Sequence, residues 1–215
     1  MMSTGRRKGR MDIRRLSSVH YYTLSIATIL FFTGMTNLQD VAFLVCSIIY
    51  LVFLDRVVFP PSNVSISLLS VFGEKNLVVG FYLVFSAVIG IFLPFLYIFE
   101  GVVKGHSQIV SIVVPNLFLI CSQVFMEGVT DVCNFSLPVQ LFVSISYNLR
   151  ITIVNWLVVD LGSVKDQNSS WRLSAGQGLV FANMLLWTFN LFGVLLPVFL
   201  PKVFKLYYAD HPKKY

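Results

Sequence analysis

Six apolar segments, each close to the length of a bilayer crossing, dominate the sequence and limit its folds. A helix needs about 20 apolar residues to cross roughly 30 Å of hydrocarbon. Helix is favoured over strand because unpaired backbone amides cannot face lipid and no alternating barrel pattern appears. We therefore predict an all-α polytopic integral membrane protein, a bundle of about six transmembrane helices. The predicted spans are residues 19–36, 41–59, 77–99, 109–126, 137–159 and 178–200.

The composition agrees with a chain that lies mostly in a membrane. Of its 215 residues, 56% are hydrophobic and only 12% are charged, whereas soluble domains carry about 25% charged residues. The polar segments between the apolar runs are too short to fold alone. We predict one membrane domain, residues 19–200, between a basic N-terminal tail, residues 1–18, and a basic C-terminal tail, residues 201–215.

Turn residues and prolines mark where the spans end or bend. Residues 37–40, Asn-Leu-Gln-Asp, predict a tight turn and a helix cap between the first two spans. Pro60 and Pro61 stop the second span. Pro94 and Pro115 lie inside the third and fourth spans, where we expect kinks.

The basic residues predict the orientation. They gather near both ends of the chain, and the net charge is +6. Beside apolar runs, such clusters indicate cytosolic retention and attraction to anionic lipid rather than binding to nucleic acid. With six spans and both termini cytosolic, twelve of the 16 Lys and Arg residues face the cytosol, against eleven if the fifth segment does not cross. The positive-inside rule therefore favours six spans.

The first apolar run imitates a signal peptide, because it follows a basic segment. It is longer than a usual signal core and lacks a clean small-residue cleavage site, so we interpret it as an uncleaved span. An organelle transit peptide is the alternative interpretation of the Arg-rich start. A span of about 17–18 residues is about 26–27 Å long along the helix axis. This length matches the thin membrane of the endoplasmic reticulum or another endomembrane.

Two kinds of modification motif occur. Ser17 follows two arginines and a leucine, a pattern typical of basic-directed kinases, and a phosphate there would weaken attraction to lipid. Asn63, Asn134 and Asn168 each begin a glycosylation sequon. In the six-span orientation only Asn168 lies on the lumenal side, so it is the candidate glycosylation site.

Arg150 is the main candidate for a functional intramembrane residue, because it lies near the middle of the fifth apolar run. A charge at that depth costs roughly 2.5–3.5 kcal/mol, so it normally has a partner and faces the protein interior or a water cavity. Its candidate partners are Glu127, Asp131 and Asp160, near the ends of the fourth and fifth spans, and Asp55 near the end of the second. Arg150 either binds a substrate or ion, forms a structural ion pair, or lies on a tilted helix.

Asparagines form a second candidate polar group. Asn148 and Asn155 are seven residues apart and share one face of the fifth helix, away from the arginine. Asn183 and Asn190 lie with Trp187 on one face of the sixth helix. Buried amides hydrogen-bond across membrane helices at roughly 0.6–2 kcal/mol each. These residues either hold helices together or line a polar pathway.

The other titratable residues form no known catalytic or metal pattern. Glu127 and Asp131 are spaced four residues apart near an interface, where hydrated charges are expected rather than a cation site. The three cysteines are too scattered for a disulfide framework or a metal site. No nucleophile elbow, zinc-protease motif, P-loop or dinucleotide motif occurs. We predict no enzyme activity, and no catalytic residue, metal or cofactor.

An internal similarity raises the question of a repeat. Gly90-Ile-Phe-Leu-Pro94 ends the third span and Gly193-Val-Leu-Leu-Pro197 ends the sixth. Two inverted halves of three spans are typical of secondary transporters. At the same offset the fourth span does not align well with the first, which does not favour a true repeat.

The first third of the chain contains a block that can be compared with known families. It comprises His20-Tyr21-Tyr22-Thr23-Leu24 and Phe53-Leu54-Asp55-Arg56-Val57-Val58-Phe59-Pro60. This block resembles a family of uncharacterised multi-pass membrane proteins of land plants. The resemblance implies a plant source and an unassigned function, and no site residues are carried over.

Two functions remain open on this sequence. The favoured one is a non-enzymatic scaffold or assembly partner, which needs only packing faces and basic tails. Its partners would be the bilayer and another membrane protein or a second copy of the chain. The alternative is a small transporter or channel subunit, which needs a polar cavity around Arg150. A dry bundle with Arg150 paired favours the first, and charges around an accessible cavity favour the second.

Overall fold

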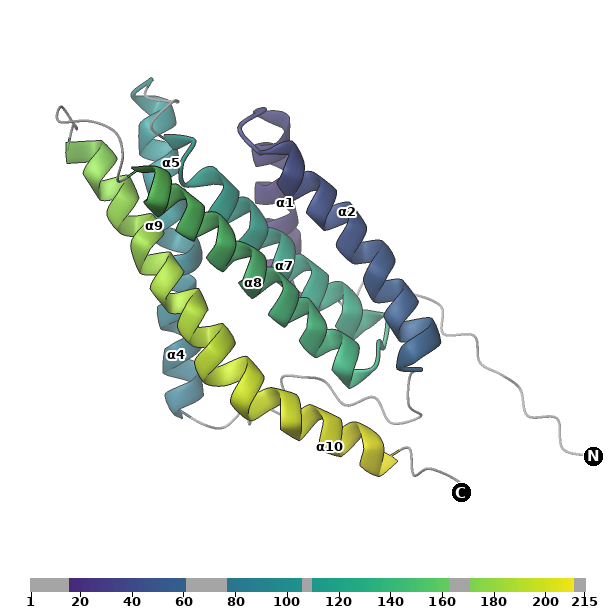
Figure 1. The fold of residues 1–215 in the computed structure, drawn as a ribbon. Helices are drawn as coiled ribbons and strands as arrows, with labels where there is room; N and C mark the ends of the chain where they lie inside the picture. The colour runs from purple at the N-terminus through teal and green to yellow at the C-terminus, as the bar shows by residue number, and fades with distance from the viewer. Residues whose placement is uncertain (1–15, 61–76, 106–109, 163–170, 211–215) are drawn as a thin grey trace, which may run out of the picture.

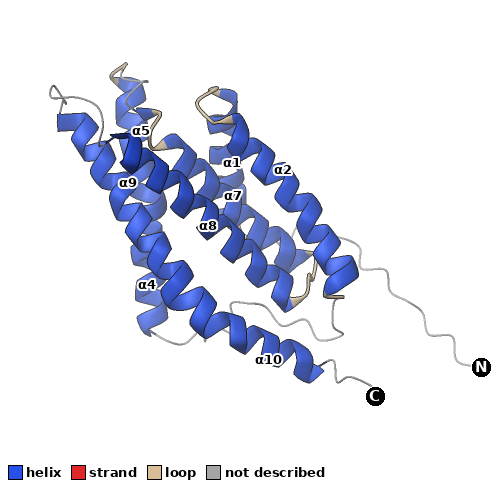
Figure 2. Ribbon diagram, in the orientation of Figure 1, coloured by secondary structure: helices blue, strands red, loops and turns tan. Residues whose placement is uncertain are grey.

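The computed structural model describes residues 16–60, 77–105, 110–162 and 171–210. These residues fold almost entirely into helices and contain no strand (Figure 2). The elements in chain order are α1 (Ser18–Phe32), α2 (Leu38–Phe53), η2 (Leu54–Val58), α4 (Leu77–Ala87), η3 (Val88–Phe92), α5 (Leu93–Val103), α7 (Val114–Val132), α8 (Leu137–Gly162), α9 (Trp171–Phe189), η4 (Asn190–Phe199) and α10 (Leu200–Asp210). The η segments are π-helices that continue the neighbouring α-helices. The all-helical prediction is confirmed for these residues.

Four continuous helices are long and apolar enough to cross a membrane, by length and composition. They cover Leu38–Val58, Gly80–Val103, Leu137–Asp160 and Trp171–Ala209, and they match the second, third, fifth and sixth predicted spans. Within the described residues, α1 is apolar but only 15 residues long, and α7 is not among the four. The fold therefore supports a polytopic membrane bundle, whereas the count of six depends on α1 and α7.

α7 lies at the centre of the bundle, which explains its weaker apolar pattern. It packs between α1 and α8 (Figure 1). Most of its side chains are buried, including the polar residues Asn116, Ser122 and Gln123. A helix that is surrounded by other helices can keep polar side chains, because few of them meet lipid. α7 begins and ends later than the predicted span 109–126, so Glu127 and Asp131 lie inside a helix.

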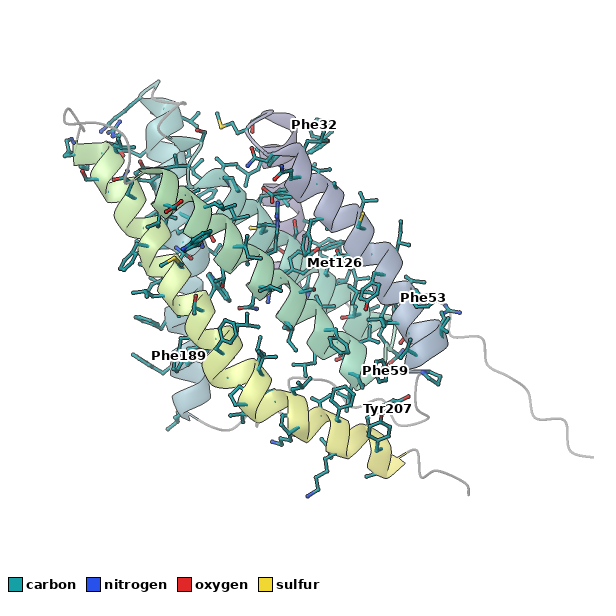
Figure 3. All side chains as sticks on the ribbon, viewed as in Figure 1. Phe32, Phe53, Phe59, Met126, Phe189 and Tyr207 are labelled. Carbon is teal, nitrogen blue, oxygen red and sulfur yellow. The ribbon has the colours of Figure 1, made fainter. Side chains whose placement is uncertain are left out.

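Many large apolar side chains lie on the outside of the bundle, and several polar side chains are buried inside it. Phe32 is 79% exposed and Phe81 is 74% exposed, whereas Asn148 and Asn183 are fully buried. Figure 3 shows Phe32 pointing away from the helices, while Met126 lies among them. A large exposed apolar surface around buried polar groups is typical of a protein in contact with lipid.

Each π-helix lies beside a proline. η2 ends shortly before Pro60, η3 ends shortly before Pro94, and η4 contains Pro197. In η3 the Leu93 amide donates to the Val88 carbonyl, five residues back. The wider turn accommodates the proline ring, so the irregularity predicted at Pro94 takes the form of a π-helix. Pro115 lies instead in the first turn of α7, where a proline fits without a kink.

The C-terminal helix is longer than predicted at both ends. α9, η4 and α10 form one rod from Trp171 to Asp210, so helix covers most of the segment predicted as a tail. At about 1.5 Å per residue, its apolar part rises about 58 Å, roughly twice the hydrocarbon thickness. α10 packs on the end of η2: the rings of Phe59 and Tyr207 lie 5.7 Å apart, and the Tyr207 hydroxyl donates to the Pro60 carbonyl at 3.2 Å (Figure 3).

Candidate functional site

Arg150 forms an ion pair with Asp40 inside the bundle. Its Nε and Nη2 atoms both donate to Oδ1 of Asp40, at 3.1 and 2.8 Å. The Asp40 side chain is 1% exposed and the Arg150 side chain is 22% exposed. The guanidinium carbon lies 6.0 Å from the centre of the Phe43 ring, at the outer limit of a cation–π contact. The charge that α8 brings into the bundle is therefore neutralised by α2.

This partner differs from the ones that the sequence predicts for Arg150. Asp131 and Asp160 are exposed, and Glu127 bonds to other residues. The sequence predicts that Asp40 belongs to the turn that starts at Asn37, whereas in the structure it lies in the first turn of α2. The pairing therefore puts Arg150 beside the first turn of α2, next to the polar turn between α1 and α2.

Asp55, the remaining candidate partner, holds the start of α8. It lies in η2 and is 3% exposed, and its Oδ1 accepts the Ser136 amide at 2.9 Å. Ser136 directly precedes α8, so a negative side chain stands at the N-terminus of that helix, where the helix dipole favours it. The contacts of Asp40 and Asp55 together align α2 antiparallel to α8 along most of the length of α2.

The two asparagines of α8 join it to two further helices. The Asn148 amide donates to the Ser144 carbonyl at 2.6 Å, and its Oδ1 accepts from Asn190 at 2.9 Å. Asn155 donates to Oδ1 of Asn116 on α7 at 3.1 Å. Since Arg150 reaches α2, the polar residues of α8 bond to three different neighbours. The structure thus brings Asn148 and Asn190 together and keeps Asn155 apart from them.

Asn183 compensates for the π-helix in η3. Its Nδ2 donates to the Ile89 carbonyl at 3.0 Å, and its Oδ1 accepts from Trp187 Nε1 at 3.1 Å. The Ile89 carbonyl needs this donor because the Leu93 amide is bonded to Val88 and Pro94 has no amide. The predicted face of Asn183, Trp187 and Asn190 is therefore used to fix α9 and η4 against their neighbours.

Glu127 and Asp131 do not form a paired site. Oε1 of Glu127 accepts from Gln123 Nε2 at 2.9 Å and from Ser144 Oγ at 2.7 Å. Asp131 is exposed one turn further along α7. Among the residues that the structure describes, no group of three His, Cys, Asp or Glu side chains is arranged to hold a metal ion.

A second ion pair joins α9 to α5. Arg172 Nη2 donates to Oε1 of Glu100 at 2.8 Å, and Lys104 contacts the same oxygen. The Tyr97 hydroxyl donates to the Arg172 carbonyl at 2.9 Å. Arg172 lies between the predicted spans 137–159 and 178–200, whereas α9 already begins at Trp171. The spacing of Glu100 and Lys104 was visible in the sequence, but the approach of α9 was not.

The candidate modification sites lie in different circumstances. Ser17 is exposed and caps the N-terminus of α1. Its amide donates to His20 Nδ1 at 3.1 Å. The candidate glycosylation site Asn168 lies outside the described residues. Phosphorylation of Ser17 therefore remains a prediction from its sequence context, and so does glycosylation of Asn168.

Each of the two Gly-x-x-x-Pro segments contains π-helix, η3 in the first and η4 in the second, but their glycines pack differently. A Cβ atom at Gly90 would lie 2.9 Å from Cζ2 of Trp187, so α9 packs closely against η3 at this point. A Cβ atom at Gly193 would meet only the Phe189 ring of its own helix, at 3.1 Å. The similarity between the two segments is therefore local.

A family model described as Domain of unknown function (DUF7733) matches residues 15–208. No curated protein matches the chain, and neither does any solved structure.

Proposed function

The chain belongs to this family of unknown function, and we propose that it is a non-enzymatic membrane scaffold or assembly partner. The ion pair between Arg150 and Asp40 carries the proposal. A substrate site would need an open charge, whereas this arginine is neutralised within the chain. The pairing lowers the support for a transporter or channel subunit built around Arg150. A land-plant source stays a prediction from the N-terminal resemblance.

The other buried amides support the same function. Asn148, Asn155 and Asn183 each bond to another helix, so their polar atoms hold the bundle together. The outer surface offers apolar side chains to lipid or to another membrane protein. Near the C-terminus, Lys202 and Lys205 are exposed on α10, where basic side chains would attract anionic lipid of the cytosolic leaflet.

A photo-crosslinking residue tests the scaffold proposal. At Phe81, exposed on α4, it should trap a discrete membrane protein or a second copy of the chain in native membranes. At Tyr147, which is fully buried, the same residue should give only intrachain products and serves as the matched control. Lipid adducts alone at Phe81, Phe85 and Phe32, together with a monomer in mild detergent, would contradict an assembly role.

We further propose six spans with both termini cytosolic. Three contacts between the ends of predicted spans support this orientation: His20 lies against Gly128, Asp55 against Ser136, and Tyr207 against Pro60. Protease treatment of sealed microsomes should remove tags from both termini, and Asn168 should be the glycosylated sequon. A protected C-terminal tag, or a glycan on Asn63 or Asn134, would contradict the six-span orientation.

The proposed membrane is the endoplasmic reticulum or another endomembrane. It is supported by α1, whose 15 residues rise about 23 Å and suit a thin bilayer. α7 and the four continuous helices that are apolar enough to cross a membrane are longer and add no support. Fractionation of cells should find the native protein with endoplasmic reticulum markers, and recovery only with the plasma membrane or an organelle envelope would contradict this location.

A further inference from the structure

Glu127 differs from the other carboxylates inside the bundle, because no cation pairs with it in the described residues. Asp40 pairs with Arg150 at 2.8 Å, and Glu100 pairs with Arg172 at 2.8 Å. Asp55 accepts the amide that precedes α8. Both groups that donate to Glu127, Gln123 Nε2 and Ser144 Oγ, are neutral, and both reach the same oxygen, Oε1.

Among the described residues, no side chain around Glu127 forms an ion pair with it. The titratable side chains that face it are His20 of α1 and Tyr147 of α8. His20 is close because its ring packs on Gly128. Nδ1 of His20 accepts the Ser17 amide at 3.1 Å. The side-chain hydrogen bonds of Glu127 in the described structure come from Gln123 and Ser144, not from His20 or Tyr147.

The side-chain amide of Gln123 gives an independent sign that a hydrogen-bond donor is missing beside Glu127. Gln123 is 6% exposed, and its Oε1 is buried without a hydrogen-bond partner in the described structure. Its Nε2 is already used by Glu127. A carboxylate and an orphan acceptor thus lie side by side, an arrangement that is costly for an ionised acid within low-dielectric surroundings.

We propose that Glu127 is a proton-binding site, whose carboxyl group keeps a proton in the folded bundle, whereas Asp40 and Glu100 each have an arginine partner. The proton removes the negative charge that no neighbour balances. The proposal does not depend on the scaffold function. It adds a titratable group at the contact of α1, α7 and α8, where His20, Gly128 and Ser144 meet.

Thermal unfolding of the purified full chain in mild detergent tests the proposal. In the unfolded chain a Glu side chain loses its proton at about pH 4.3. Above that pH the folded chain would bind one more proton than the unfolded chain, so the free energy of unfolding should fall as the pH rises. Glu127→Gln replaces the acid by a neutral side chain of nearly the same shape. At about pH 5, wild type and Glu127→Gln should have melting temperatures within about a degree of each other. At about pH 9, wild type should melt several degrees below Glu127→Gln. Asp131→Asn, which alters an exposed carboxylate one turn away, should follow wild type. Parallel curves for wild type and Glu127→Gln over this range would overturn the proposal.

Carbodiimide labelling gives a second readout that needs no variant to fold. Dicyclohexylcarbodiimide reacts with protonated carboxyl groups in apolar surroundings. In native membranes, mass spectrometry should find Glu127 modified at about pH 6 and less modified at about pH 9, equally in sodium and choline buffers. No modification of Glu127 at either pH would overturn the proposal. Protection by sodium at constant pH would also overturn it, because the site would then bind a metal cation rather than a proton.

Discussion

Replacing Arg150 by Leu should remove about 3–5 kcal/mol from the free energy of unfolding. The substitution leaves Asp40, whose side chain is 1% exposed, without its counter-charge. Asp40→Leu should cost less, because Arg150 is 22% exposed and can turn towards the polar turn between α1 and α2. Thermal unfolding in detergent and the yield of folded protein measure both effects.

The double variant separates a structural ion pair from other uses of Arg150. Asp40→Leu with Arg150→Leu removes both charges and should recover most of the loss. Asp160→Leu with Arg150→Leu is the matched control, because Asp160 is exposed and should restore nothing. An Arg150→Leu protein as stable as wild type would mean that the pair does not hold the bundle together.

Replacing Gly90 by Leu should have the second large effect. The Cβ atom alone would lie 2.9 Å from Cζ2 of the buried Trp187 and 3.5 Å from Cδ1 of Ile120. Overpacking of this kind typically costs about 1–3 kcal/mol, and a branched side chain between two helices should reach the upper end or exceed it. α9 would also be displaced from the Ile89 carbonyl, which accepts from Asn183. The melting temperature in detergent and the yield of folded protein measure the loss.

Gly80 provides the matched control for this prediction. Gly80 and Gly90 lie on the same rod, which α4, η3 and α5 form together. A Cβ atom at Gly80 meets nothing within 4 Å. Gly80→Leu should therefore leave stability within about 0.5 kcal/mol of wild type, as substitutions away from contacts usually do. Equal losses for the two variants would show that glycine matters in this rod for its backbone rather than for the approach of Trp187.

The elements that face lipid could be predicted best from the sequence. α2, α8 and the rod from α4 to α5 present long apolar surfaces, and their apolar runs agree with the helices to within a few residues. α7 was placed several residues too early, because the protein surrounds it and its polar residues break the apolar run. The start of α9 was missed for a similar reason, since Arg172 is buried against Glu100 rather than exposed in a loop.

The candidate polar residues could be named from the sequence, but their partners could not. Asn148 and Asn190 bond to each other, and Arg150 forms an ion pair, as a residue at such a depth should. The partner Asp40 is separated from Arg150 by 110 residues and follows a turn, so local spacing gave no reason to choose it. Which acid meets which base depends on the antiparallel register of α2 and α8, and periodicity within one helix does not encode that register.

The separation of Asp40 and Arg150 along the chain also has a consequence for synthesis. A ribosome adds about 5–20 residues each second, so α2 must wait roughly 5–20 s for the arginine that neutralises it. Throughout that interval Asp40, in the nascent hairpin of α1 and α2, has no counter-charge. The hairpin therefore cannot yet adopt the packing that it has in the complete protein. Translation speed between the two residues therefore sets how long the newborn chain is exposed to the proteases and chaperones that remove incomplete membrane proteins.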